Sequence, residues 1–415
     1  MGVLVSRLSV SKNKIHILLL EGIHESAIRA LNANGYTNIE THAGAPDPET
    51  LKKRLRRAHV VGIRSRTKLT GDILAKADRL FSIGCFCIGT NQVDTQAAKL
   101  RGIPVFNAPY SNTRSVAELV IGEIIMLFRR VHEKSTLAHA GVWRKTAEGA
   151  REIRGKVLGV VGYGHIGSQV SILAEALGMR VRYFDIVDKL SLGNASACGS
   201  LAELLEASDV VSLHVPGTPE TRGMIGAEEL RRMKPGSCLI NAARGDVVDL
   251  DALAQAIEDG HLFGAAVDVF PAEPAGGEDP LETPLLGLPN VILTPHVGGA
   301  TEEAQANIGA EVAEKLIKYS DNGSTIGAVN FPEASLPAQR DATRFLHIHR
   351  NVPGVLARVN EVFSSKGLNI AGQYLRTDAE VGYMVTDIDG RLDAGMGIRR
   401  ELQGIEGTIR VRFLY

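Results

Sequence analysis

Three polar residues in the second half of the chain could together carry acid–base chemistry on a small acid. Arg244 lies in NAARGD, Glu273 in VDVFPAEP and His296 in LTPHVGGAT. A guanidinium can bind a carboxylate in a bidentate pair, an imidazole can accept and return a proton near neutral pH, and a carboxylate beside it would orient the ring and stabilise its protonated form. Each residue also has a simpler explanation when it is considered alone. Arg244 could form a surface ion pair, Glu273 could be an ordinary loop acid between prolines, and His296 could be bonded to backbone. Their meaning therefore depends on the elements that hold them.

A glycine-rich stretch lies upstream of these residues. The apolar run VLGVV (157–161) predicts a buried strand, and Gly162, Gly164 and Gly167 follow it and open the predicted helix SQVSILAEALG. With 44 glycines in the chain, this spacing alone is weak evidence. Asp185, however, ends the next predicted strand 18 residues after Gly167, close to the ~20 residues expected of the acid that binds the ribose of a dinucleotide. The stretch therefore predicts a dinucleotide-binding turn.

The acid at position 185 favours NAD over NADP as the cofactor. Its carboxylate can accept hydrogen bonds from a ribose 2′-hydroxyl and would repel a 2′-phosphate. Arg182 and Lys189 lie nearby and favour the opposite choice. The alternative role for Asp185 is to cap the turn that follows its strand.

Apolar segments alternate with helical ones along most of the chain, which predicts an α/β protein with two doubly wound parallel sheets. Arg244, Glu273 and His296 each follow a strand of the second sheet, at the carboxyl edge where such sheets bind ligands. The predicted strands are 14–20, 60–64, 80–84 and 103–106 in the first sheet, and 157–161, 181–185, 209–215, 237–243, 263–270 and 290–296 in the second.

The same pattern predicts three domains. A discontinuous substrate-binding domain (1–111 and 300–335) surrounds an NAD-binding domain (112–299), and one continuous helix is expected over 115–139. A segment rich in Gly, Pro, Ser and Asn then leads to a third domain (343–415) with the element order βαββαβ, a ferredoxin-like fold.

Composition excludes several functional classes. The 46 Lys and Arg residues balance 47 Asp and Glu, a net charge of −1, so no global field favours nucleic acid or an anionic membrane. Four cysteines are too few for a disulfide framework and lack zinc-site spacing, so no metal is expected. The sequence contains no run of ~18 consecutive apolar residues, so no membrane span is predicted. We expect a cytoplasmic protein.

Together, the glycine turn and the ordered residues Arg244, Glu273 and His296 resemble the D-isomer-specific 2-hydroxyacid dehydrogenases. The resemblance implies that His296 takes the hydroxyl proton while a hydride passes from the substrate to NAD, that Glu273 orients the imidazole, and that Arg244 clamps the substrate. It also implies cofactor contacts by Gly162, Gly164, His165, Ile166, Gly167, Asp185, His214, Ala242 and Asp268.

Two features bear on the substrate. In GIRSRT (62–67), Arg64, Ser65 and Arg66 follow a predicted strand and could bind a phosphate; the alternative is an ordinary surface loop. The βαββαβ unit resembles an ACT domain, an amino-acid-sensing module, although this fold also serves purely structural roles.

With YSNTRSVAE, these features are similar to the branch of the family that oxidises 3-phospho-D-glycerate to 3-phosphooxypyruvate, the first step of L-serine biosynthesis. The resemblance implies feedback inhibition by L-serine and a homo-oligomer, expected to be a tetramer. The segment HAG (42–44) has alanine where some members of this branch carry lysine, so one basic phosphate contact is expected to be absent and the substrate range is left open. The implied substrate residues are Arg64, Ser65, Asn112 and Gln305, with Arg66 and Lys145 as further contacts, and the implied serine site joins His349 and Asn351 to Asn369 across from them.

Two other functions remain compatible with the sequence. One is a dehydrogenase of an unphosphorylated D-2-hydroxy acid such as glycerate or lactate. The other is a non-catalytic, NAD(H)-sensing protein similar to the corepressors that share this scaffold.

Overall fold

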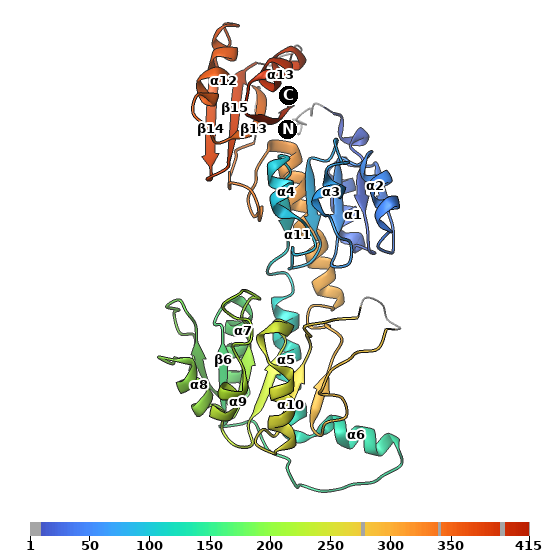
Figure 1. Ribbon diagram of the computed structural model, residues 1–415, viewed down its shortest axis with the longest axis vertical. Helices are drawn as coiled ribbons and strands as arrows, with labels where there is room; N and C mark the ends of the chain where they lie inside the picture. The colour runs from blue at the N-terminus through green and yellow to red at the C-terminus, as the bar shows by residue number, and fades with distance from the viewer. Residues whose placement is uncertain (1–9, 275–278, 339–341, 391–394, 415) are drawn as a thin grey trace. The chain divides into compact units, whose positions relative to one another are not determined.

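The computed structural model describes residues 10–274, 279–338, 342–390 and 395–414. The chain divides into two compact units, Met1–Ser111 with Gln305–Tyr415 and Asn112–Ala304. The first unit carries a parallel and an antiparallel sheet, and the second carries one larger parallel sheet (Figure 1). No helix among the described residues combines the length and the apolar character needed to cross a bilayer.

The parallel sheet of the first unit has the strand order β2-β1-β3-β4-β5. Alternate side chains of its strands enter two separate cores: Leu18, Val61 and Ile83 pack with α2, α3 and α4, whereas Ile17, Leu19 and Val60 pack with α1 and α11. A short 3-10 turn, Lys12–Lys14, precedes the sheet. The elements are β1 (Ile17–Leu19), α1 (Glu25–Ala33), β2 (Ile39–Thr41), α2 (Pro48–Leu55), β3 (Val60–Ile63), α3 (Gly71–Leu74), β4 (Ser82–Cys85), α4 (Thr95–Leu100), β5 (Val105–Asn107) and α11 (Glu302–Asn322).

The second unit has seven parallel strands in the order β12-β11-β10-β9-β6-β7-β8. Helices α5 and α7 cover one face, and α8, α9 and α10 cover the other. The chain order reverses between β6 and β9, which is where a doubly wound sheet opens a crevice for its ligand. The elements are α5 (Thr113–Arg129), α6 (Val131–His139), β6 (Val157–Val161), α7 (His165–Ala176), β7 (Arg180–Phe184), β8 (Ser196–Ala197), α8 (Leu201–Ala207), β9 (Val210–Leu213), α9 (Ala227–Arg232), β10 (Cys238–Asn241), a 3-10 turn (Gly245–Val247), α10 (Leu250–Glu258), β11 (Gly264–Val267) and β12 (Val291–Leu293).

The prediction of one continuous helix over 115–139 is wrong. Arg130 adopts the left-handed conformation (φ 52°) and ends α5, and α6 begins at the next residue. The Arg130 Nε lies 2.5 Å from the carboxylate of Glu133 on α6. Helix α6 buries none of its side chains, so no core keeps it in line with α5.

The C-terminal part of the first unit is an antiparallel sheet with the order β14-β15-β13-β16. Helices α12 and α13 pack on one face around Phe345, Phe363 and Leu402. Its elements β13 (Ala342–Arg350), α12 (Val355–Ser364), β14 (Ile370–Thr377), β15 (Val381–Asp389), α13 (Gly395–Gly404) and β16 (Thr408–Leu414) have the predicted order βαββαβ. The expected fold class is confirmed.

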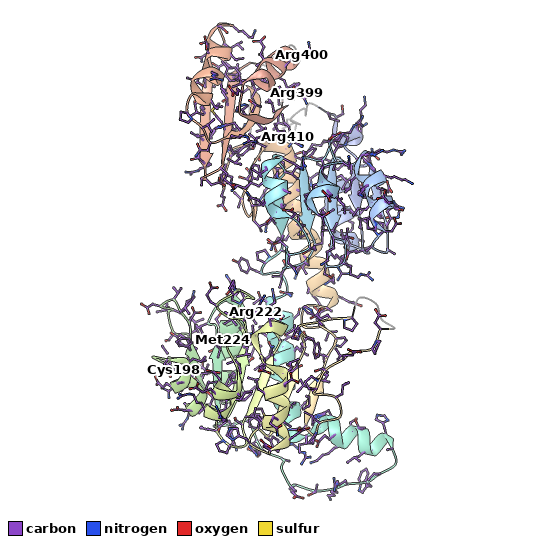
Figure 2. All side chains as sticks on the ribbon, in the orientation of Figure 1. Cys198, Arg222, Met224, Arg399, Arg400 and Arg410 are labelled. Atoms are coloured by element: carbon purple, nitrogen blue, oxygen red, sulfur yellow. The ribbon has the colours of Figure 1, made fainter. Side chains whose placement is uncertain are left out.

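The other face of this sheet shares a core with the parallel sheet. Leu346, Ile348 and Tyr383 belong to the same cluster as α1 and α11. Arg410 on β16, labelled in Figure 2, donates to the carbonyl of Leu80. The two sheets of the first unit are therefore packed together rather than joined only by a linker.

Candidate functional site

The glycines after β6 build a close turn with one open position. A Cβ on Gly162 (φ 91°) would lie 2.5 Å from the carbonyl oxygen of His214, and a Cβ on Gly167 would lie 2.2 Å from that of Gly162. At Gly164 a Cβ would meet nothing within 4 Å. Helix α7 begins at His165. The turn thus combines two forced backbone contacts with open space at a helix N-terminus, which fits the pyrophosphate of a dinucleotide.

Asp185 directly follows β7 and is held beside this turn. Its Oδ2 accepts the N–H of Tyr163 at 2.8 Å, and its Oδ1 accepts the N–H of Val187 at 3.0 Å. Each carboxylate oxygen retains a lone pair for a ribose hydroxyl. Nearby Arg182 pairs with Glu203 at 2.8 Å, so one of the two cations that could attract a 2′-phosphate is already engaged.

His214 follows β9, and its backbone lies directly beside Gly162 of the glycine turn. Its Nε2 lies 2.9 Å from the hydroxyl of Ser212, and its Nδ1 is buried without a partner among the described residues. Burial lowers the pKa of His214 to about 4, so the ring is neutral at physiological pH. Ile166 and Ala242, the other expected cofactor contacts, are half-buried.

His296 and Glu273 are in contact, as the sequence interpretation requires. The Nδ1 of His296 lies 2.9 Å from each carboxylate oxygen of Glu273. The pair is accessible, with 53% of the histidine side chain and 40% of the glutamate side chain exposed. His296 has a left-handed backbone (φ 54°), a conformation that is uncommon for residues other than glycine and that clusters at functional sites. The imidazole is thus oriented through one nitrogen, and its other nitrogen bonds to none of the described residues.

Arg244 follows strand β10, Glu273 follows β11 and His296 follows β12. These three strands are parallel neighbours, since β10 pairs with β11 and β11 pairs with β12. The Arg244 loop is pressed against the loop that carries Glu273: a Cβ on Gly245 would lie 2.0 Å from the backbone carbon of Phe270. The Arg244 Nη1 donates to the carbonyl of Ala243 at 2.6 Å. The sheet therefore presents Arg244, Glu273 and His296 along one carboxyl edge.

Asp268 holds the loop that carries His296. Its carboxylate accepts the N–H groups of Val297 at 2.8 Å and Gly298 at 2.9 Å and the hydroxyl of Thr294 at 2.6 Å. The side chain is buried. Asp268, which the sequence predicts as a cofactor contact, therefore also supports the backbone of the loop that carries His296.

A buried acid behind this loop was missed by sequence reasoning. Glu123 on α5 is 1% exposed, and its carboxylate has no hydrogen-bond partner among the described residues. Burial, and secondarily the charge of Asp268, raise the pKa of Glu123 to about 8. The sequence signal that could have identified Glu123 is its position among the apolar residues of α5 that face the core.

The expected substrate residues are divided between the two units. Arg64 and Ser65 lie after β3 in the first unit, and their side chains form no hydrogen bond or ion pair with the described residues. Gln305 lies on α11 in the same unit. Asn112 begins the second unit; its Oδ1 is buried and unpaired within the described chain, and its side chain abuts the backbone of Gly299. Lys145 lies exposed in the loop after α6.

The expected serine-site residues do not converge within one chain. His349 pairs with Gly382 in the β13–β15 ladder, whereas Asn369 directly precedes Ile370, which pairs with Ile388. Six residues of β15 separate these positions, about 20 Å at ~3.4 Å per residue. Asn351 is at the His349 end and donates to the carbonyl of Asp378 at 2.7 Å. Asn369 is therefore not across from the other two in a single chain, because the hairpin register carries it to the far end of the sheet.

Known proteins share both the sequence and the fold. Residues 121–298 match the model of the D-isomer specific 2-hydroxyacid dehydrogenase NAD binding domain, and residues 345–410 match an AHAS small subunit-like ACT domain. NAD as the expected cofactor is thereby confirmed.

The relatives include full-length matches. D-3-phosphoglycerate dehydrogenase of Escherichia coli K12 is 58% identical over 99% of this chain and 100% of its own, and the Dictyostelium discoideum enzyme of the same name is 48% identical over 98% and 99%. The crystal structure of D-lactate dehydrogenase from Aquifex aeolicus with NAD and lactic acid superposes with a TM-score of 0.66 at 30% identity, covering 77% of this chain and all of that one. The chain belongs to the D-3-phosphoglycerate dehydrogenase family, within the NAD-dependent D-isomer-specific 2-hydroxyacid dehydrogenases.

Proposed function

We propose that this enzyme oxidises the C2 hydroxyl of 3-phospho-D-glycerate to the ketone of 3-phosphooxypyruvate, the first step of L-serine biosynthesis. The observation that carries the proposal is the contact of His296 Nδ1 with both carboxylate oxygens of Glu273 at 2.9 Å. It provides a proton acceptor whose cationic form has a fixed counter-charge. The names of the full-length relatives support the choice of substrate.

The acid–base step runs through His296. The outer nitrogen, Nε2, takes the proton of the C2 hydroxyl as the carbonyl forms, and Glu273 stabilises the resulting imidazolium. Bound NAD supplies the hydride acceptor, nicotinamide C4. Arg244 binds the substrate carboxylate and the developing carbonyl oxygen, which requires a fixed guanidinium at the adjoining strand end.

The phosphate is assigned to the loop after β3. Arg64 and Ser65 carry uncommitted donor groups there, and Asn112 and Gln305 complete the proposed substrate contacts. A guanidinium recognises a phosphate through parallel N–H donors. An enzyme for lactate or glycerate would not need this loop.

We further propose that L-serine inhibits the enzyme at a site shared by two ACT domains. His349 and Asn351 of one chain would face Asn369 of a second chain, because an antiparallel two-fold pairing of β14 brings opposite ends of the two sheets together. Strand β14 is an edge strand, and its Tyr374 and Leu375 are 37% and 40% exposed. An exposed apolar edge of this kind favours pairing with another chain.

A second interface between NAD-binding domains would complete a homotetramer. Val142 and Trp143, in the loop after α6, are 49% and 87% exposed, and exposed aromatic side chains are typical of contact surfaces. The four cysteines are free thiols, which supports a cytoplasmic location.

The test follows NADH at 340 nm with 3-phospho-D-glycerate, D-glycerate and D-lactate, with and without L-serine. We expect turnover of the phosphorylated acid, its loss in His296→Ala, and inhibition by serine. Faster turnover of D-glycerate or D-lactate would favour the unphosphorylated acid as substrate. NAD binding without any turnover would favour the NAD(H)-sensing protein. Unchanged turnover in saturating serine, with serine binding verified by calorimetry, would contradict the regulatory proposal.

A further inference from the structure

A buried carboxylate holds the phosphate-binding loop from behind. The side chain of Glu21, two residues after the end of β1, is 2% exposed. Its Oε1 accepts the N–H groups of Arg64 at 3.1 Å and Thr67 at 2.8 Å, and its Oε2 accepts the N–H of Arg66 at 2.9 Å. The Glu21 carboxylate therefore accepts hydrogen bonds from three of the four backbone N–H groups of residues 64–67.

Glu21 is held in an unusual conformation to do this. Its backbone is left-handed (φ 64°), and its own N–H bonds to the carbonyl of Gly44 at 3.4 Å. Burial by itself raises the pKa of Glu21, but the hydrogen bonds from the loop outweigh burial and lower that pKa below its ordinary value. The carboxylate therefore stays ionised against the loop at neutral pH.

A second buried side chain, that of Gln92, forms a hydrogen bond with a backbone carbonyl of the same loop. The Nε2 of Gln92, a buried residue, donates to the carbonyl of Arg64 at 2.7 Å. A backbone bridge between Leu69 and Val93 holds the Gln92 segment beside the loop. The backbone of Arg64 is thus bonded on both its N–H and its carbonyl side by groups that lie under the surface.

This arrangement decides how the loop can bind an anion. Clustered backbone N–H groups are themselves an anion site, but here a carboxylate of the protein already occupies three of them. Of the amides of residues 64–67, Glu21 leaves only that of Ser65 for a phosphate, so most of the contacts to a phosphate must come from side chains. Arg64 and Ser65 have no side-chain partners among the described residues, and the Arg66 Nε, on a side chain that is 58% exposed, is 3.9 Å from Glu21.

We propose that Glu21 is a positioning residue for phosphate recognition, a role that rests on the proposed function of the enzyme. It does not touch the substrate. It fixes the backbone of residues 64–67 so that the guanidinium and hydroxyl donors of the loop are preorganised for a phosphate, and Gln92 supports it from the carbonyl side. Preorganised donors bind with less loss of conformational freedom.

The test is Glu21→Gln, which keeps the shape but leaves one acceptor oxygen and turns an amide N–H₂ toward an N–H of the loop. The matched control is Glu25→Gln, the same substitution at an exposed helix position paired with Arg29. Steady-state rates with 3-phospho-D-glycerate give kcat and KM, and NADH fluorescence gives cofactor affinity. We expect KM to rise about tenfold or more, with kcat within about threefold and NADH affinity unchanged, whereas the control behaves as wild type.

Gln92→Leu is the second variant and removes the bond to the Arg64 carbonyl without altering any charge. We expect a selective rise in KM of about threefold to tenfold. If Glu21→Gln lowers kcat, raises KM and weakens NADH binding by similar factors, the damage is general and the proposal is overturned. A KM equal to that of the wild type in Glu21→Gln would also overturn it. If circular dichroism shows that Glu21→Gln is unfolded, a wild-type KM in Gln92→Leu overturns it. Failure of the wild-type enzyme to turn over 3-phospho-D-glycerate would instead overturn the proposed function.

Discussion

Replacing Glu273 by glutamine should slow the chemical step without disturbing the fold. The substitution keeps one oxygen within reach of His296 Nδ1 but removes the charge that now lies 2.9 Å away through both oxygens. In the proposed reaction this charge matters most when the imidazole has taken up the hydroxyl proton. The loss therefore falls on the transition state rather than on substrate binding.

The magnitude follows from the type of bond and its exposure. A hydrogen bond to a charged group contributes about 1.5–3 kcal/mol, and solvent screening of a pair that is 53% and 40% exposed favours the lower end of this range. At ~1.4 kcal/mol for each factor of ten, we expect kcat to fall between about tenfold and about 100-fold. Because exposed ion pairs contribute at most ~1 kcal/mol to folding, the melting temperature should change by only a few degrees.

The assay compares kcat and KM for wild type, Glu273→Gln, His296→Ala and the double variant, with Glu282→Gln as a control at an exposed position of the same segment. Residues that act as one unit are non-additive, so adding Glu273→Gln to His296→Ala should cost less than about threefold. A single variant with kcat within twofold of wild type would refute the reasoning. So would a full additional loss in the double variant.

Three further outcomes are expected. Arg64→Ala should raise KM for 3-phospho-D-glycerate at least about tenfold through loss of a bidentate phosphate contact, and an unchanged KM would remove the loop from the site. Gly167→Ala places a Cβ 2.2 Å from the Gly162 carbonyl oxygen and should weaken NADH binding at least about tenfold in a fluorescence titration; wild-type affinity would contradict the tight turn. Glu123, with its pKa raised to about 8, binds more protons folded than unfolded between about pH 4.5 and 8, so its contribution to stability is full at low pH and is lost as pH rises through this window. The melting temperature of Glu123→Gln relative to wild type should therefore increase from pH 5 to pH 8, and a pH-independent difference would show that Glu123 is ionised.

Local patterns predicted the elements well where the core alone selects them. The strand over 157–161 has its predicted bounds, since VLGVV is buried at almost every position. Four strands of the second sheet were predicted two or three residues too long at their carboxyl ends, namely 209–215, 237–243, 263–270 and 290–296. The chain leaves the sheet there while still apolar. The short edge strands Ile39–Thr41 and Ser196–Ala197 were missed because they bury little.

The helix break at Arg130 and the register of the C-terminal sheet were beyond the sequence pattern. An arginine gives no local signal for a left-handed residue, and helical periodicity continues through it. The βαββαβ order was predictable, but the pairing that carries Asn369 away from His349 depends on which residues face each other across β15.

By itself the sequence determined the two parallel α/β sheets, the glycine turn and the acid at position 185, because periodicity and glycine sterics act over a few neighbouring residues. It also supplied Arg244, Glu273 and His296 as candidates. Only the tertiary structure brought Glu273 within 2.9 Å of His296, placed Asp268 beneath that histidine's loop, and set Glu21 behind residues 64–67. These contacts join loops from 23 to 46 residues apart, and their geometry depends on how parallel strands align at one edge of a sheet, which no local pattern encodes.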